Sequence, residues 1–145
     1  MPTLLWLSAI AVFSTDTFSA RHTESILLRI IHLVYGSISY RHFNVIHVFV
    51  RKASHFSVYS LLSLMSFYSW RATLPGRRRW EFKWSGLALA LTLLAACLDE
   101  FHQGFVPSRG PSVHDVVLDM MGAVFVQVLI ASFTNVVVVK RRAHD

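Results

Sequence analysis

The chain has 145 residues, of which 54% are hydrophobic and only 15% are charged. Soluble domains have about 25% charged residues, so this composition excludes an ordinary soluble protein and indicates one membrane domain over residues 1–145. The net charge of +6 comes from basic residues in short clusters between apolar runs. That placement is typical of membrane topology signals and excludes a nucleic-acid-binding surface.

The first apolar run covers residues 2–13, shorter than the roughly 20 residues that a membrane span needs. Serine and threonine hydroxyls in the following residues can bond back to helix carbonyls, so we predict a short N-terminal span over 2–20. No basic residue precedes the run, and a secretory signal peptide is therefore not expected.

Residues 24–38 carry an apolar segment with a polar stripe. Ser25, Arg29, His32 and Gly36 follow one another at spacings of 4, 3 and 4, which places them on one face of a helix. Such an amphipathic segment is expected to lie in the plane of the membrane interface, here at the outer face.

Three longer apolar segments predict membrane spans at 53–70, 84–106 and 113–139. The linker 71–83 carries five Lys and Arg against one Glu, and residues 140–142 are all basic. Two spans separate these clusters, so both lie on one side of the membrane, which the positive-inside rule makes cytoplasmic. Trp70, Trp80 and Trp84 are expected to form an aromatic belt at that interface. The predicted fold class is an all-α polytopic helix bundle with a cytoplasmic C-terminus.

Four of the eight acidic residues fall within residues 98–122, where two predicted spans meet. An acid at the centre of a span costs roughly 2.5–3.5 kcal/mol, so such residues usually have partners and a function. At about 1.5 Å per residue, Asp99, Glu100 and Asp119 lie at a similar depth below the outer surface. Lys52 and His55 of the preceding span lie near the same level.

Helical spacing groups the polar residues of each span on single faces. The groups are Lys52, His55 and Tyr59; Asp99 with Gln103, and Glu100 with Gln103; and Asp115, Asp119 and Gly122. Ser112-x-x-Asp115 is also a candidate capping box, which would assign part of the role of Asp115 to the helix N-terminus.

Four motifs in order resemble the VanZ-like family of small bacterial membrane proteins. They are Arg51-Lys52-x-x-His55-Phe56-x-x-Tyr59, Asp99-Glu100-x-x-Gln103, Val106-Pro107-x-Arg109 and Asp115-x-x-x-Asp119-x-x-Gly122. Family members often carry an acid before the motif tyrosine, where this chain has Val58. The resemblance implies a protein of the bacterial cytoplasmic membrane, associated in some members with low-level resistance to the glycopeptide teicoplanin. It implies no defined reaction.

We expect a charged pocket near the outer leaflet that binds a lipid, a lipid-linked molecule or another cell-envelope molecule. In an enzyme, His55 or Glu100 would act as general base, with Asp99 and Asp119 as the other catalytic candidates. The candidate substrate-binding residues are Arg51, Lys52, Tyr59, Gln103, Arg109 and Asp115. Two alternatives stay open: binding without chemistry, and an ion-pair network that only fixes helix packing.

The sequence predicts neither a metal ligand nor a cofactor. Histidines and acids are present, but no spacing such as H-E-x-x-H occurs. Asp99 and Glu100 are adjacent and are therefore expected to point from different faces of their helix. The histidines other than His55 are expected at solvated or interfacial positions, and Cys97 and Met120–Met121 are interpreted as packing residues.

Overall fold

The structure is a computed structural model that describes residues 2–13, 20–36, 39–74, 80–105 and 110–142. Within these ranges the side chains of residues 2, 13, 20–24, 26, 34–35 and 135–142 are not described. Over the described ranges every regular element is a helix and no strand forms, which confirms the predicted all-α class. The helices are α1 (Pro2–Phe13), α2 (Ala20–Tyr35), α3 (Tyr40–Thr73), α4 (Phe82–Gln103) and α5 (Val113–Arg142).

Two helices are long and apolar enough to cross a membrane. They are α4, over Phe82–Gln103, and the first 22 residues of α5, over Val113–Thr134. At about 1.5 Å per residue each segment extends roughly 33 Å, close to the thickness of a bilayer's hydrocarbon core. These segments match the predicted spans 84–106 and 113–139 within a few residues.

The remaining predicted span, 53–70, lies inside α3 and is not among the helices that pass this test. Its apolar character is diluted by serines at every third position, from Ser54 to Ser69. The helix itself begins well before residue 53, at Tyr40. It follows Gly36, whose φ of 71° suits glycine, and it ends at Leu74, which is extended as expected for a residue before proline.

The N-terminal helix α1 covers Pro2–Phe13, and residues 14–19 of the predicted span 2–20 lie outside the described residues. Twelve residues extend only about 18 Å, well short of a bilayer's hydrocarbon core. The helix runs antiparallel to α3, because Thr3 Oγ1 lies 2.7 Å from Ser69 Oγ while Ile10 packs near Tyr59. It is therefore a short helix packed on the side of α3.

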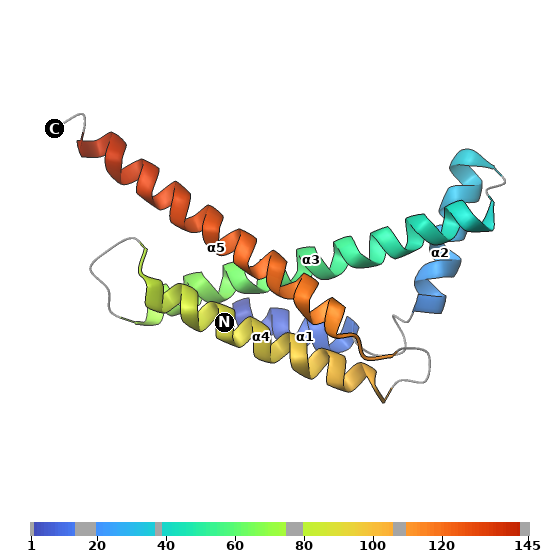
Figure 1. The fold of residues 1–145 in the computed structure, drawn as a ribbon, viewed down its shortest axis with the longest axis horizontal. Coiled ribbons are helices and arrows are strands. Elements are labelled where there is room, and N and C mark those ends of the chain that lie inside the picture. The colour runs from blue at the N-terminus through green and yellow to red at the C-terminus, as the bar shows by residue number, and fades with distance from the viewer. Residues whose placement is uncertain (1, 14–19, 37–38, 75–79, 106–109, 143–145) are drawn as a thin grey trace.

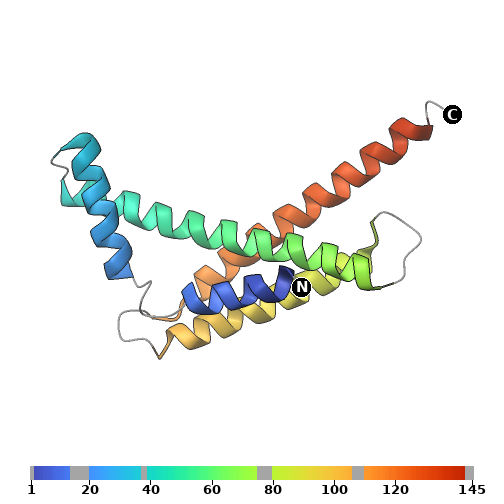
Figure 2. The same cartoon turned by 180° about the vertical axis from the view of Figure 1, so that it is seen from behind.

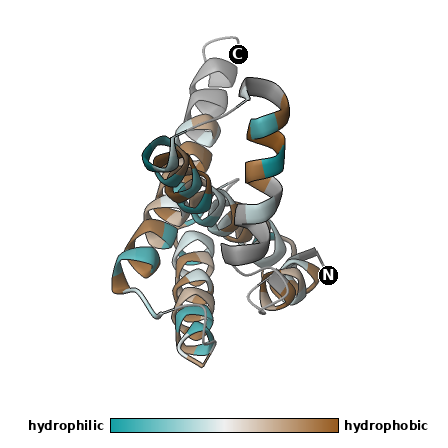
Figure 3. Cartoon of the chain, turned by 90° about the vertical axis from the view of Figure 1, so that its right-hand side faces the viewer, coloured by the Kyte–Doolittle hydropathy of each residue, from teal (hydrophilic) through white to brown (hydrophobic). Residues whose placement is uncertain are grey.

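The amphipathic helix α2 covers Ala20–Tyr35, beginning and ending a few residues before the predicted 24–38. Ser25, Arg29 and His32 of the polar stripe are exposed, whereas Ile31 is buried. Figure 3 shows hydrophilic and hydrophobic residues side by side along this helix. The predicted amphipathic helix is thus confirmed, and its place at a membrane interface stays a prediction.

Helices α3, α4 and α5 form the main packing unit. In Figure 1, α5 crosses α3, and α4 lies below the crossing. Figure 2 shows α1 on the opposite side, along α3 and α4. One cluster of the core joins Phe67, Trp84, Ala88 and Ile130. Trp84 is only 2% exposed, so its predicted place in an aromatic belt is wrong: it packs edge-on against Phe67.

Candidate functional site

Nine of the ten predicted site residues come from three helices. The middle of α3 supplies four of them, the last five residues of α4 supply three, and the first two turns of α5 supply two. We call this set the charged cluster: Arg51, Lys52, His55, Tyr59, Asp99, Glu100, Gln103, Asp115 and Asp119. The tenth predicted residue, Arg109, lies outside the described residues.

His55 and Asp119 join α3 to α5 at the centre of the cluster. His55 Nδ1 lies 3.2 Å from Asp119 Oδ1, and the Asp119 side chain has no exposed surface. The imidazole also stacks on the ring of Tyr59, with 6.3 Å between centroids. The carboxylate therefore fixes the orientation of the imidazole, and the ring's other nitrogen, Nε2, is left for another partner.

Glu100 connects the end of α4 to the start of α5. Its Oε2 accepts a hydrogen bond of 2.6 Å from the backbone N–H of Ser112, and the residue is only 5% exposed. In the predicted capping box this N–H would have bonded to Asp115. The acceptor comes instead from another helix, so Glu100 caps α5 while Asp115 is engaged elsewhere.

Asp99 and Gln103 form the i, i+4 pair expected from their spacing. Gln103 Nε2 donates to Asp99 Oδ2 at 2.9 Å, and Gln103 is buried. The amide thus holds one oxygen of the Asp99 carboxylate and fixes its direction.

Arg51 and Lys52 lie at the rim of the cluster. Asp115 Oδ2 is 3.7 Å from Arg51 Nη2, and Asp115 Oδ1 is 3.5 Å from Lys52 Nζ. Both cationic side chains remain at least one-third exposed, so ion pairs of this length contribute about 0–1 kcal/mol. Their remaining N–H donors are available to a ligand.

Several buried polar atoms of the cluster have no hydrogen-bond partner among the described residues. They are Tyr59 Oη, Asp99 Oδ1, Glu100 Oε1, Gln103 Oε1 and Asp119 Oδ2. Four of the five are carboxylate or amide oxygens, which need a donor or a cation. A buried polar atom without a partner costs about 1–3 kcal/mol, so these oxygens form a candidate binding site.

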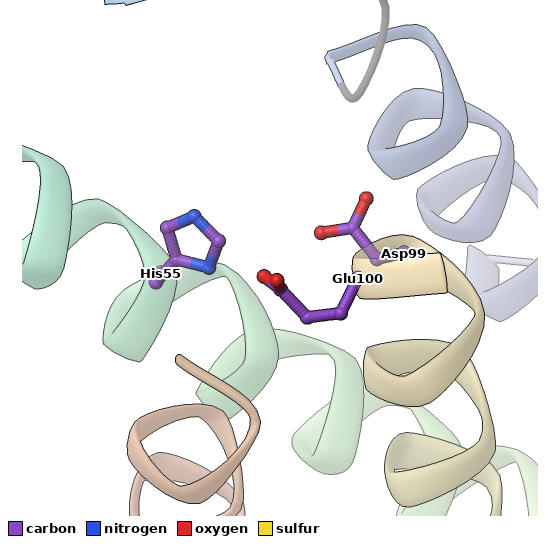
Figure 4. Close-up of side chains that lie close together, drawn as sticks. All are labelled: His55, Asp99 and Glu100. Carbon is purple, nitrogen blue, oxygen red and sulfur yellow. The ribbon is translucent and has the colours of Figure 1, made fainter. Parts of the chain in front are cut away.

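His55, Asp99 and Glu100 converge on one point, as Figure 4 shows. Each offers one metal-ligating atom, and these three atoms lie within 4.8 Å of one another. The sequence-based expectation that adjacent Asp99 and Glu100 point apart is therefore wrong. The two side chains leave the helix in different directions, but the longer Glu100 side chain bends toward the imidazole of His55.

The sequence did not predict the contacts that hold α3 against α5. A Cβ added to Gly122 would lie 2.5 Å from the carbonyl oxygen of Phe56 and 2.6 Å from Ser60 Oγ. One turn further along, Gln127 Nε2 donates to both Ser63 O (3.1 Å) and Ser63 Oγ (2.8 Å). The serines at every third position of α3 and the glycine at position 122 of α5 were the available signal.

Other predicted roles fall outside the cluster. Cys97 and Met121 are exposed in the isolated chain, so neither is an interior packing residue. His42, His102 and His114 are exposed, as expected, and His47 stacks on Phe43.

The model of the family described as VanZ/LLP1 matches residues 1–134. The chain belongs to the VanZ/LLP1 family. Neither the curated proteins nor the solved structures that were compared gave a match. Family membership confirms the resemblance drawn from the four motifs, three of which lie wholly within the described residues and supply the charged cluster. Together with the two apolar helices, it identifies this VanZ/LLP1 protein as a membrane protein.

Proposed function

We propose that the charged cluster binds the anionic head group of a membrane lipid or of a lipid-linked cell-envelope molecule. The observation that carries this proposal is the set of unpartnered buried oxygens below two partly exposed cations, Arg51 and Lys52. A ligand with hydrogen-bond acceptors for the two cations and donors for the buried oxygens would satisfy both sets of groups.

A phosphate-containing head group has the required chemistry. Its phosphate oxygens accept hydrogen bonds from Arg51 and Lys52, which are charged donors at the rim. Hydroxyl or amine groups on the same head group would donate to the free oxygens of Gln103 and Asp119, which are buried. Arg109, which the family motif places between α4 and α5, would add a further cation from the outer side.

The proposed setting is the bacterial cytoplasmic membrane, crossed several times, with the C-terminus inside. The basic linker after α3 and the basic C-terminal end of α5 support this orientation through the positive-inside rule. The charged cluster lies at the end of α4 opposite that linker and in the middle of α3, which supports a position toward the outer leaflet. There it would contact lipid-linked precursors at the surface, and occupancy of the site would lower susceptibility to teicoplanin.

Head-group preference tests the proposal. Detergent-solubilised protein is titrated with phosphatidic acid, phosphatidylglycerol and phosphatidylcholine of matched acyl chains, and bound lipid is counted by native mass spectrometry. We expect the anionic lipids to bind more tightly. Lys52→Gln should weaken them roughly tenfold, because a hydrogen bond to a charged group contributes about 1.5–3 kcal/mol.

Arg71→Gln is the matched control, since Arg71 is an exposed cation at the other end of α3. It should leave anionic lipid binding unchanged. Equal affinity for all three lipids, or equal weakening in both variants, would contradict a head-group site at the cluster.

Catalysis is a second candidate function because His55 is paired with a fully buried carboxylate, as in a general base held in one orientation. Purified protein is incubated with labelled lipids and cell-wall precursors, with divalent metal present. A change of mass that His55→Ala abolishes would establish turnover. Binding without any change of mass over long incubation would restrict the function to binding.

The purely structural alternative has its own readout. Glu100→Gln and His55→Ala should remove drug protection while the protein still inserts and folds. If the same variants instead fail to accumulate in the membrane, the cluster serves helix packing.

A further inference from the structure

Two of the three converging residues are carboxylates that a partner holds by one oxygen only. Gln103 Nε2 donates to Asp99 Oδ2, and the Ser112 N–H donates to Glu100 Oε2. The oxygens left over are Asp99 Oδ1 and Glu100 Oε1. Metal-ligating carboxylates are usually themselves hydrogen-bonded, and these two match that pattern. His55 offers the third ligand atom, within 4.8 Å of the others, and its Nδ1 also lies 3.2 Å from Asp119 Oδ1.

Burial gives a second, independent observation. Glu100 is 95% buried, and its Oε1 has no hydrogen-bond partner in the described part of the chain. Figure 4 shows this carboxylate directed at the His55 ring. The free Asp99 Oδ1 is buried as well. Two buried carboxylate oxygens beside an imidazole form a site for a cation.

The charge of the cluster also favours a bound cation. Both described cations at the rim pair with Asp115, and no described Lys or Arg forms an ion pair with Asp99, Glu100 or Asp119. His55 alone faces these three carboxylates. Buried charges without compensation are strongly destabilising, and one divalent ion would remove most of the excess.

We propose that His55, Asp99 and Glu100 bind a divalent transition-metal ion, with zinc as the best fit. Calcium and magnesium take oxygen ligands only, six or more in number, whereas an imidazole with carboxylates suits zinc and its neighbours. Three protein ligands are also the number that zinc sites with an open position use. The open position would accept a ligand oxygen from the membrane side.

Coordination requires the three ligand atoms to move closer together. Two atoms at about 2.1 Å from one tetrahedral zinc ion lie about 3.4 Å apart, compared with up to 4.8 Å here. Rotation of the Asp99 and Glu100 side chains about their own torsions would supply this change.

Metal content tests the proposal directly. Tag-free full-length protein is stripped with EDTA, loaded with zinc and dialysed, and its zinc is measured by inductively coupled plasma mass spectrometry. We expect about one zinc ion per chain in the wild type. Glu100→Gln and His55→Gln should retain less than about a tenth of it, because a lost ligand removes several kcal/mol of affinity.

His102→Gln is the matched control, because His102 is an exposed histidine on the same turn of α4. It should keep the full zinc content. No zinc in the wild type, or the same content in all variants, would overturn the proposal. If Glu100→Gln does not fold, X-ray absorption spectroscopy of the zinc-loaded wild type decides. Nitrogen and oxygen ligands at about 2.0–2.2 Å support the site. A sulfur ligand would implicate Cys97 and contradict the site.

The metal site would be part of the proposed lipid-binding site. It rests on that proposed function only in that the lipid would supply the ligand at the open position of the zinc ion. The two proposals fail separately. Zinc bound without any head-group preference would remove the lipid proposal alone, whereas head-group preference in a chain that binds no zinc would remove the metal alone. Lys52→Gln should weaken lipid binding and leave the zinc content unchanged.

Discussion

Gly122 sets how closely α3 and α5 approach beside the charged cluster. It lies one turn after Asp119, and its added Cβ would meet the backbone oxygen of Phe56, the neighbour of His55. Because a backbone atom cannot rotate away, Gly122→Ala must push the two helices apart. We expect a loss of about 1–3 kcal/mol in the free energy of unfolding, as for other overpacked sites. Unfolding of the purified protein by a denaturing detergent, followed by circular dichroism, measures it.

Gly86→Ala is the matched control for this substitution. Gly86 is also within a helix, but an added Cβ there meets no atom within 4 Å. Alanine has the higher helix propensity by about 1 kcal/mol, so this variant should be as stable as the wild type or slightly more stable. Equal losses in both variants would mean that the close approach at Gly122 has no special role.

At the scale of residues, helical spacing predicted which side chains share a face, and the pairing of Asp99 with Gln103 confirms it. Spacing could not predict the convergence of Asp99 and Glu100 on His55, because it describes directions at the backbone. Where a long side chain ends depends on the neighbouring helix. The bond from Ser112 to Glu100 likewise joins two helices, and no local motif contains it.

At the scale of helices, the limits of α4 and α5 followed from apolar composition, whereas those of α3 did not. A charge-free run indicated 53–70, but the helix covers Tyr40–Thr73. Neither glycine nor proline occurs between Gly36 and Pro75, so no strong helix breaker interrupts the chain over that stretch. Composition therefore locates the apolar part of a helix, and the helix breakers locate its ends.

Gln127 and Ser63 form a polar clamp between α5 and α3. Gln127 donates two hydrogen bonds to Ser63, whose hydroxyl in turn donates to the backbone oxygen of Ala123 at 3.3 Å. Gln127→Leu removes the donor while keeping a side chain of similar size. Hydrogen bonds between membrane helices contribute about 0.6 kcal/mol each on average, so we expect a loss of about 1 kcal/mol. The same detergent unfolding experiment measures it.

Thr92→Val provides the comparison for this clamp. Thr92 is equally buried, but its hydroxyl donates within its own helix to Ala88 O at 2.8 Å. Because no contact between helices is lost, the variant should unfold like the wild type. A loss in Thr92→Val as large as in Gln127→Leu would show that buried hydroxyls and amides matter here regardless of which helices they join.

At the scale of the whole molecule, the sequence predicted that three helices carry their charged residues at one depth, and the structure brings those residues together. The fixed rise of a helix was enough to predict that these residues share one level, and their depth in a membrane stays a prediction. The crossing of α5 over α3 in Figure 1 could not be predicted in this way. It depends on small residues such as Gly122 meeting a particular stretch of the partner helix, which is a property of two surfaces together.

The two ends of α4 are predicted to lie on opposite sides of the membrane. The basic segment 71–83 precedes α4, so that end should be cytoplasmic and Gly110, after α4, should be outside. Single cysteines at Gly110 and at Thr73 are introduced into a Cys97→Ala background. Both positions are exposed, and a Cβ at Gly110 meets no atom within 4 Å.

A membrane-impermeant maleimide applied to intact cells should label Gly110→Cys but not Thr73→Cys. After lysis both should react to a similar extent, which controls for accessibility of the thiols, and the Cys97→Ala parent should not react in either condition. Labelling of Thr73→Cys alone in intact cells would invert the orientation and place the charged cluster toward the cytoplasm. In that case a ligand would have to reach the cluster from the inner leaflet, and the proposed link with a glycopeptide that acts at the cell surface would fail.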